Sequence, residues 1–276
     1  QISLAVRDRP LQEMGIPHVV VAENPAWERM RYAMSGAPRR HRPKIAAGAW
    51  RLERAQRAMV RSGDALACNG WAAWTAYGHV ARQTNRHAPL LFLDSRVSLR
   101  DVAESRAQRA KPRPEGPPRL AFSGRLHPAK GPQHAVEVSE RLWAQGIEHS
   151  LLVLGDGPLR APLETRSGPQ IEFAGALPFV PDWTERVRDQ IDLMLLPHTQ
   201  GDPSGTYVET AAMGVPIAGF SNAALRGHVD HGGIGWVAPV ADVSRLATIV
   251  ARALHDPALL ARTSRHALDY AERFAM

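Results

Sequence analysis

The stretch "LAFSGRLHPAKGPQHAVEVSERLWAQGIEHSLLVL", residues 120–154, contains two short apolar runs separated by a segment of helical periodicity. Residues 120–123 and 150–154 have the length and apolar content of buried strands, and residues 133–145 repeat apolar positions every three or four residues. A strand, a helix and a second strand in this order form a crossover unit whose strands pair in parallel. The stretch therefore predicts an α/β fold with a parallel sheet.

The same alternation continues through the chain. In the second half we expect further strands at residues 170–173, 191–196 and 215–218, and helices at 159–165, 183–189, 206–213, 243–254 and 257–274. In the first half we expect strands at residues 18–22, 64–68 and 90–93, and helices at 46–62 and 71–82. Residues 101–118, "DVAESRAQRAKPRPEGPP", have the composition of an exposed linker. We therefore predict two domains, residues 1–110 and 111–276, the second a doubly wound sheet.

The composition is that of an ordinary globular protein, with 276 residues of which 44% are hydrophobic and 22% charged. The longest apolar runs are much shorter than the roughly 18 residues of a membrane span. Cys68 is the single cysteine, which excludes an internal disulfide and fits a reducing compartment, and we expect it to be a small buried core residue. No period of 20 to 50 residues repeats, so solenoids and propellers are excluded.

The net charge of +7 favours polyanionic partners, and its densest cluster is "RRHRPK", residues 39–44. The cluster has no interleaved aromatic residues on which bases could stack. We interpret it as a solvated loop first, a membrane-surface patch second and a nucleic-acid contact third. The chain starts at Gln1 without an initiator methionine, and we expect it to be part of a longer protein.

In open parallel sheets, ligands bind beside the loops that follow the strands. The loop "FSGRLHPAKG", residues 122–131, turns at Gly124 and presents Arg125 and Lys130 ahead of a helix. Two cations beside a helix N-terminus suit a diphosphate, because the free N–H groups and the helix dipole add to their charge. The alternative is that Arg125 and Lys130 are ordinary surface charges.

A second loop, "LVLGDGPL" at residues 152–159, ends a strand in a Gly-Asp-Gly-Pro turn. Gly155 and Gly157 allow either a tight reversal or the close approach of a ligand. The loop lacks the spacing of the Gly-x-Gly-x-x-Gly fingerprint, which argues against a nicotinamide-dependent enzyme.

A third loop begins "QGDPSGTYVETAAMGVPIAG", residues 200–219. Residues 203–205 form a turn that leads into a helix, so the amides near Gly205 and Thr206 can donate to a phosphate. Glu209 lies about one turn further, where its carboxylate can accept from the vicinal hydroxyls of a ribose. Alternatively, Glu209 is a first-turn carboxylate that only complements the helix dipole.

Four motifs in order, "GRLHPAKG", "LGDGPL", "FAGALP" and "GDPSGTYVETAAMGVPIAG", make residues 120–276 resemble the C-terminal domain of retaining glycosyltransferases of family 4. The segment "RAQRAMVRSGDALACNG", residues 54–70, resembles the helix and strand near the end of that family's N-terminal domain. The resemblance implies the GT-B fold, with two Rossmann-like doubly wound domains of which the N-terminal one is truncated here. It also implies transfer of a hexose, with retention, from a nucleoside-diphosphate sugar.

The resemblance assigns roles to individual residues. Arg125 and Lys130 match the basic pair that grips the donor diphosphate and assists its departure. The positions implied to bind the donor are Gly124, Leu177, Ser204, Gly205, Thr206 and Glu209, with Leu177 near the nucleobase and Glu209 at the ribose. No Asp-x-Asp occurs in the sequence, so we expect no metal, with Arg125 and Lys130 taking its role, and no cofactor besides the donor.

The sequence departs from the family pattern in two places. The family has a pair of glutamates eight positions apart, but the residue eight before Glu209 is Gly201, and the nearest acid is Asp202. We expect Asp202 either to reach a hydroxyl of the donor sugar, as a third catalytic residue, or to cap the turn before the helix. The second departure is length, since the first half has three candidate strands and lacks the Gly-rich acceptor-side loop that the family carries near its start. The family also often ends the strand at residues 18–22 with a histidine, where this sequence has Glu23 and Asn24, so we assign no base.

Three functions are consistent with these features. The first is a glycosyltransferase that uses a UDP- or GDP-sugar and a polysaccharide- or lipid-linked acceptor. The second is a GT-B-fold nucleotide-sugar epimerase, which the pair Arg125 and Lys130 disfavours. The third is a non-catalytic module that binds a nucleotide or another polyanion. We expect a cytoplasmic protein with peripheral contact to the anionic inner face of the membrane, and no nucleic-acid partner.

Overall fold

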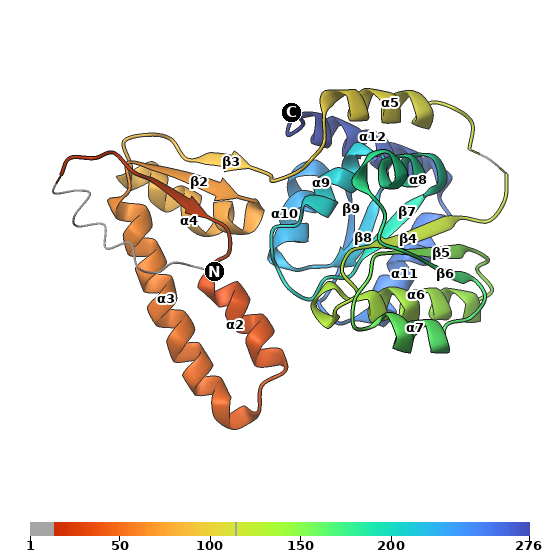
Figure 1. Ribbon diagram of the computed structural model, residues 1–276, viewed down its shortest axis with the longest axis horizontal. Helices are drawn as coiled ribbons and strands as arrows, with labels where there is room; N and C mark the ends of the chain where they lie inside the picture. The colour runs from red at the N-terminus through yellow and green to blue at the C-terminus, as the bar shows by residue number, and fades with distance from the viewer. Residues whose placement is uncertain (1–13, 114) are drawn as a thin grey trace. The chain divides into compact units, whose positions relative to one another are not determined.

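The computed structural model describes residues 14–113 and 115–276, and the expectation that concerns Gln1 lies outside them. The chain forms two compact units, one of the residues up to Asp94 together with Gly201–Pro203, the other of residues 95–200 and 204–276 (Figure 1). Each unit is built on a parallel sheet, which confirms the predicted α/β class. The predicted domain limits, residues 1–110 and 111–276, stay a prediction, and the compact units divide after Asp94.

The N-terminal unit contains a three-stranded parallel sheet in the order β1-β2-β3. Its elements are β1 (Val19–Ala22), α2 (Ala26–Ser35), the 3-10 turn η1 (Arg39–His41), α3 (Arg42–Ser62), β2 (Ala65–Asn69), α4 (Trp71–Thr84) and β3 (Leu90–Phe92). Helices α3 and α4 pack against each other, and their apolar side chains form a core with Leu66 and Cys68 of β2. Burial raises the pKa of the Cys68 thiol to about 12, so this residue is an inert core residue as predicted.

Helices α2 and α3 form a helical hairpin that the sequence predicts only in part (Figure 1). Residues 39–44 were expected to be a loop, but they form the turn η1 and the first residues of α3. The physical reason is Pro43, because a proline in the first turn lacks only an N–H that the helix leaves unused and has the right φ. The basic cluster therefore has a regular helical conformation at the end of the hairpin where α2 and α3 are connected.

The second unit contains a six-stranded parallel sheet in the order β6-β5-β4-β7-β8-β9, a doubly wound arrangement. Its strands are β4 (Arg119–Ser123), β5 (Ser150–Leu154), β6 (Ile171–Gly175), β7 (Leu193–Leu196), β8 (Ile217–Phe220) and β9 (Gly235–Ala238). Its helices and helical turns are α5 (Leu99–Arg109), η2 (Pro128–Lys130), α6 (Pro132–Ala144), α7 (Arg160–Arg166), η3 (Phe179–Trp183), α8 (Thr184–Gln190), α9 (Gly205–Ala212), α10 (Ala223–Gly232), α11 (Val243–Leu254) and α12 (Pro257–Glu272).

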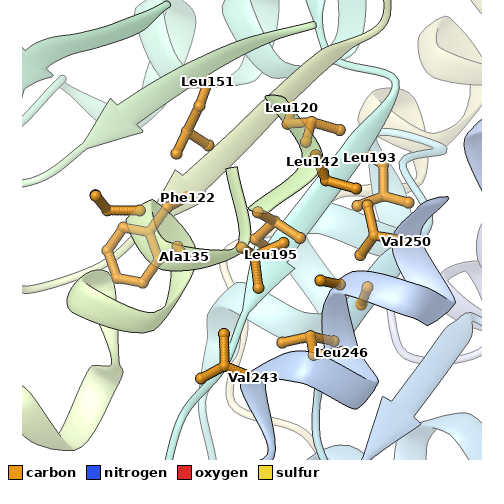
Figure 2. Close-up of a cluster of buried hydrophobic side chains, with 14 of the residues drawn as sticks. Leu120, Phe122, Ala135, Leu142, Leu151, Leu193, Leu195, Val243, Leu246 and Val250 are labelled. Carbon is orange, nitrogen blue, oxygen red and sulfur yellow. The ribbon is translucent and has the colours of Figure 1, made fainter. Parts of the chain in front are cut away.

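The main core lies between this sheet and the helices α6 and α11, which pack against each other (Figure 2). Alternate residues of the central strands point into it, because side chains along a strand alternate between the two faces. The residues shown in Figure 2 include Leu120, Phe122, Leu151, Leu193 and Leu195 from the strands, and Ala135, Leu142, Val243, Leu246 and Val250 from the helices. This core makes the sheet a rigid support for the loops at its carboxyl edge.

The predicted linker at residues 101–118 is wrong in its first part, because residues 99–109 form the helix α5. The Ser98 hydroxyl accepts from the amide of Asp101, and the Asp101 carboxylate accepts from the amide of Ser98, a capping box that starts the helix. At the other end, the Arg109 guanidinium donates to the carbonyls of Val187, Ile191 and Met213. These bonds fasten α5 to the ends of α8 and α9.

Three further elements were not predicted: α2, α10 and β9. Glycines weaken the signal of two of them, since β9 begins with a glycine and α10 contains Gly227 and Gly232. Among the described residues, no helix is both long and apolar enough to cross a bilayer.

Candidate functional site

The strand order of the larger sheet reverses between β4 and β7, and this reversal locates the expected ligand crevice. The loops that leave the carboxyl ends of these two strands are residues 124–131 and 197–204. They are joined directly, because the amide of Thr199 donates to the carbonyl of Ala129 at 3.1 Å. A Cβ on Gly131 would collide with the carbonyl oxygen of Pro197, so only glycine allows the loops this close.

The loops after β4, β5 and β6 are also in backbone contact. The amide of Gly124 donates to the carbonyl of Leu154 at 2.9 Å, and the amide of Gly155 donates to that of Gly175 at 2.8 Å. A Cβ on Gly155 would collide with the carbonyl oxygen of Gly124, and one on Gly157 would lie 2.7 Å from that of Leu126. These glycines therefore serve the packing of the loops on each other, a use that differs from the tight reversal and the ligand approach suggested by the sequence.

The two predicted cations lie on the loop that follows β4. Arg125 is exposed, and Lys130 is half-buried in the turn η2, where His127 Nδ1 accepts from the amide of Ala129 at 3.2 Å. Burial, and secondarily the charge of Lys130, hold the pKa of His198 well below its usual value. The charge of Lys130, which lies in the loop after β4, therefore also affects His198 in the loop after β7.

Helix α9 begins at Gly205, and its N-cap residue, Ser204, makes no side-chain capping bond. The amides of the first turn of a helix have no acceptors within the helix, so those of Gly205 and Thr206 can serve an anion. Glu209 is the fifth residue of α9 and only 5% exposed, so it is not the exposed first-turn carboxylate of the dipole interpretation. Its Oε1 accepts from Arg96 Nε at 2.9 Å.

Arg96 is one of three site residues that the sequence did not indicate. Its guanidinium lies 3.9 Å from the centre of the Phe179 ring, and that ring stacks on Trp183 with centroids 5.3 Å apart. Trp183 Nε1 donates at 2.8 Å to the hydroxyl of Ser123, the last residue of β4. Arg96 and Trp183 reach the site through contacts with residues distant in sequence, Glu209 and Ser123, so no local pattern could have found them.

A buried polar network supports the loop after β7. His198 Nδ1 and the Tyr207 hydroxyl are 2.9 Å apart, and Asn222 Nδ2 donates both to that hydroxyl and to the carbonyl of His198. Asn222 Oδ1 also accepts from the amide of Leu225 and caps α10. The network ties the start of α9 to β8 and α10, which holds the loop in one conformation.

Leu177 is half-buried between β6 and η3, in the loop where the sequence predicted a nucleobase. Asp202 groups with the N-terminal unit, where its Oδ1 accepts from Asn24 Nδ2 at 2.7 Å. The N-cap residue of α9 is Ser204, so the capping alternative for Asp202 is not what the structure contains. The roles of these residues in binding or catalysis stay predictions.

Two other features bear on the site. A surface hollow of about 500 Å³, lined by Pro118, Ile147, Glu148 and His255 among others, lies where β4 and β5 begin, at the opposite edge of the sheet from the crevice. In the part of the chain that the structure describes, no three histidine, cysteine or acidic side chains are grouped as a metal site requires.

Comparisons with known proteins agree with this geometry. The model of the family described as glycosyl transferases group 1 matches residues 117–256. The 2-deoxystreptamine glucosyltransferase of Streptomyces kanamyceticus is 32% identical over 167 residues, which are 57% of this chain and 43% of that protein. The amylovoran biosynthesis glycosyltransferase AmsK of Erwinia amylovora is 30% identical over 145 residues, 49% of this chain and 36% of its own. The chain thus spans less than half the length of these curated relatives.

Among solved structures, HepE of Anabaena in complex with UDP-glucose is similar, with a TM-score of 0.63 and 18% identity. The match covers 99% of this chain and 72% of HepE. At this identity the likeness concerns the fold.

Proposed function

Because the chain belongs to the glycosyl transferases group 1 family, we propose that it transfers a sugar from a nucleoside-diphosphate sugar to an acceptor. Its fold is the GT-B type that the sequence predicted, with the three-stranded and the six-stranded parallel sheets as its Rossmann-like parts. The observation that carries the proposal is the pairing of a basic loop with the open N-terminus of α9 across the reversal between β4 and β7.

This arrangement suits the departure of a nucleoside diphosphate. Negative charge grows on the phosphate as the bond to the sugar breaks, and preorganised cations and N–H groups stabilise it. In our proposal Arg125, Lys130 and the first amides of α9 supply this stabilisation without a metal, and Glu209 accepts from the ribose hydroxyls. Asp202 is the proposed contact to the donor sugar. Loss of one such donor is expected to cost about 3 kcal/mol, roughly a hundredfold in rate.

Donor and acceptor are proposed by class. The donor is a UDP- or GDP-sugar, and the structure of HepE with UDP-glucose supports the uridine form. The acceptor is a growing polysaccharide or a lipid-linked sugar, which the likeness to a glycosyltransferase of amylovoran biosynthesis supports. We further propose that configuration at the transferred sugar is retained, as the family resemblance implies.

Titration calorimetry with UDP and GDP tests the proposal. We expect one of them to bind, and we expect Arg125→Ala combined with Lys130→Ala to weaken binding at least tenfold. The matched control is Arg252→Ala combined with Arg262→Ala, which removes two exposed arginines elsewhere on the same unit. If the wild type binds neither nucleotide, or if both double variants bind as the wild type does, the proposed site is wrong.

We also propose that the protein works at the anionic inner face of the membrane, with the α2–α3 hairpin as the contact. Residues 26–62 contain ten Lys and Arg and two Glu, a net charge of +8, whereas the whole chain has +7. The rest of the protein therefore has a net charge of −1. The source of the chain's basic character is this one hairpin.

The hairpin presents these charges outward. Its exposed charged side chains among the described residues are basic, and they include Arg39, Arg40, Lys44, Arg51, Arg54 and Arg61. Of its two acidic residues, Glu28 is buried and Glu53 accepts from the Tyr77 hydroxyl. Trp50 is 60% exposed, and the Arg54 guanidinium lies 4.8 Å from its ring. Exposed tryptophan beside arginine and lysine is typical of membrane interfaces.

Co-sedimentation with vesicles tests this contact. We expect binding to phosphatidylcholine vesicles that contain 30% phosphatidylglycerol, weakened by salt, and little binding to pure phosphatidylcholine. At about 1 kcal/mol for each basic residue, Arg51→Ala combined with Arg54→Ala should weaken binding roughly 30-fold. The control, Arg252→Ala combined with Arg262→Ala, should bind as the wild type does. Equal binding to both kinds of vesicle would contradict the proposal.

A further inference from the structure

We propose that Arg96 is a positioning residue for the nucleoside end of the donor, because it orients the Glu209 carboxylate toward the ribose hydroxyls. The inference rests on the proposed function, in which Glu209 accepts from a ribose, and it adds a residue outside the predicted motifs. It also gives a role to the stack of Arg96, Phe179 and Trp183.

The first step concerns the carboxylate. Glu209 is nearly buried, and a buried carboxylate is stable only when charged or polar groups compensate it. Arg96 provides this compensation through the 2.9 Å bond from Nε to Oε1. In the described residues no donor reaches Oε2, so one oxygen is held by the protein and the other remains for a ligand.

The second step concerns what holds Arg96. Its side chain is 64% exposed, and a side chain so exposed normally samples many rotamers. Here the guanidinium is fixed between Glu209 and the face of Phe179, and Phe179 is fixed by its stacking on Trp183. Arg96 thus has a defined place although it lies at the surface.

The third step concerns where this stack is anchored. Trp183 is bound to Ser123, which directly precedes Gly124 and Arg125, and Phe179 follows the loop that contains Leu177. The stack therefore joins the end of β4, the loop after β6 and helix α9. These three places are the ones proposed for the diphosphate, the nucleobase and the ribose. Arg96 therefore connects the Glu209 carboxylate, which is proposed to bind the ribose, to the parts of the chain proposed to bind the diphosphate and the nucleobase.

Stabilising the folded chain is only part of what this ion pair does. Without Arg96 the buried Glu209 carboxylate would lose its charged partner, which is destabilising in itself. The Nη groups of Arg96 make no hydrogen bond within the described residues, so the guanidinium does not link Glu209 to any other hydrogen-bond acceptor there. What the contact does is fix the direction of one carboxylate oxygen.

The test compares ribose with deoxyribose. Titration calorimetry is done with UDP and 2′-deoxy-UDP, or with the guanine pair if GDP is the nucleotide that binds. We expect the wild type to prefer the ribonucleotide about tenfold or more, as a hydrogen bond to a charged group provides. In Arg96→Ala and in Glu209→Gln this preference should fall to less than threefold. Arg96→Lys should keep part of it, because the charge next to the carboxylate remains.

The control is Arg100→Ala, which removes an exposed arginine that pairs with Glu104 on α5 and should leave the preference unchanged. Thermal unfolding of all variants shows whether they remain folded. If Arg96→Ala keeps the full preference for ribose, the inference is refuted while nucleotide binding stands. If Arg96→Ala binds UDP more tightly, Arg96 competes with the nucleotide instead of positioning its partner, which also refutes the inference. If the wild type binds no nucleotide, the proposed function itself fails.

Discussion

We predict that the six-stranded unit loses stability between pH 7.5 and pH 5 because two of its histidines stay neutral when folded. His228 is 2% exposed, its Nδ1 is 2.8 Å from the Tyr270 hydroxyl, and burial, together with the nearby His231, lowers its pKa to about 3. His198 is 1% exposed, and its pKa is also far below the usual value. Both side chains gain a proton on unfolding in mildly acidic solution, and neither does in the folded protein.

The size of the effect follows from this difference. A depressed pKa in the folded state means that the stabilisation is complete above the unfolded pKa of about 6.5 and is lost as the pH falls below it. From pH 7.5 to pH 5 His228 costs about 2 kcal/mol, since its folded pKa of about 3 lies below the whole range, and His198 adds to the loss in the same direction. Even the loss from His228 alone is substantial beside the 5–15 kcal/mol that keeps a typical domain folded.

Urea unfolding followed by circular dichroism at pH 7.5, 6.5, 5.8 and 5.0 measures this loss. Near pH 5.5 His228 should contribute a slope of about 1.2 kcal/mol per pH unit, and His228→Gln should remove that contribution. His255→Gln, which changes an exposed histidine of the same unit, should leave the slope of the wild type. Equal slopes for the wild type and His228→Gln would show that His228 does not titrate on unfolding and would refute the reasoning.

Three further predictions concern the supports of the site. Arg109→Ala should lower the free energy of unfolding by about 3 kcal/mol in urea titrations, because it leaves carbonyls of α8 and α9 without a donor. The control, Arg106→Ala, breaks exposed ion pairs and should lower it by less than about 1 kcal/mol. Gly155→Ala should cost about 3 kcal/mol in the same assay through its collision with the loop after β4, and Gly146→Ala, with nothing near its Cβ, about 1 kcal/mol. Asn222→Ala should cost about 2–3 kcal/mol and weaken nucleotide binding in calorimetry, and unchanged binding would argue against its support of the loop after β7.

The sheet of the second unit could be predicted because its signals are local. Strands such as β4 and β5 are continuous apolar runs, and each ends at a glycine that the next loop requires. The prediction failed where the local signal was mixed: β9 begins with a glycine, which weakens a strand, and α5 lies in a charged stretch whose composition resembles a linker. The serine and aspartate at positions 98 and 101 were a helix-start signal that composition alone did not convey.

The site was predictable to the extent that it lies on loops next to the strands. The positions of Arg125, Lys130 and Glu209 after β4 and β7 follow from topology, because neighbouring parallel strands bring their carboxyl ends together. The ion pair of Glu209 with Arg96 joins residues 113 positions apart, and no periodicity or spacing encodes it. Sequence reasoning therefore found the groups proposed to meet the ligand and missed the side chain that orients one of them.

Two positions that differ from the family pattern, Asn24 and Asp202, are joined in the structure. Asn24 follows β1, where the family often has a histidine, and Asp202 lies one position from the expected glutamate, yet the two side chains are hydrogen-bonded to each other. The Asn24 Oδ1 is buried without a partner in the described residues, so the amide is held by its bond to Asp202 and remains able to accept from a hydroxyl. An amide cannot exchange a proton as a histidine does, whereas a carboxylate can. Any proton transfer at this pair would therefore have to use Asp202, with Asn24 as the group that orients it.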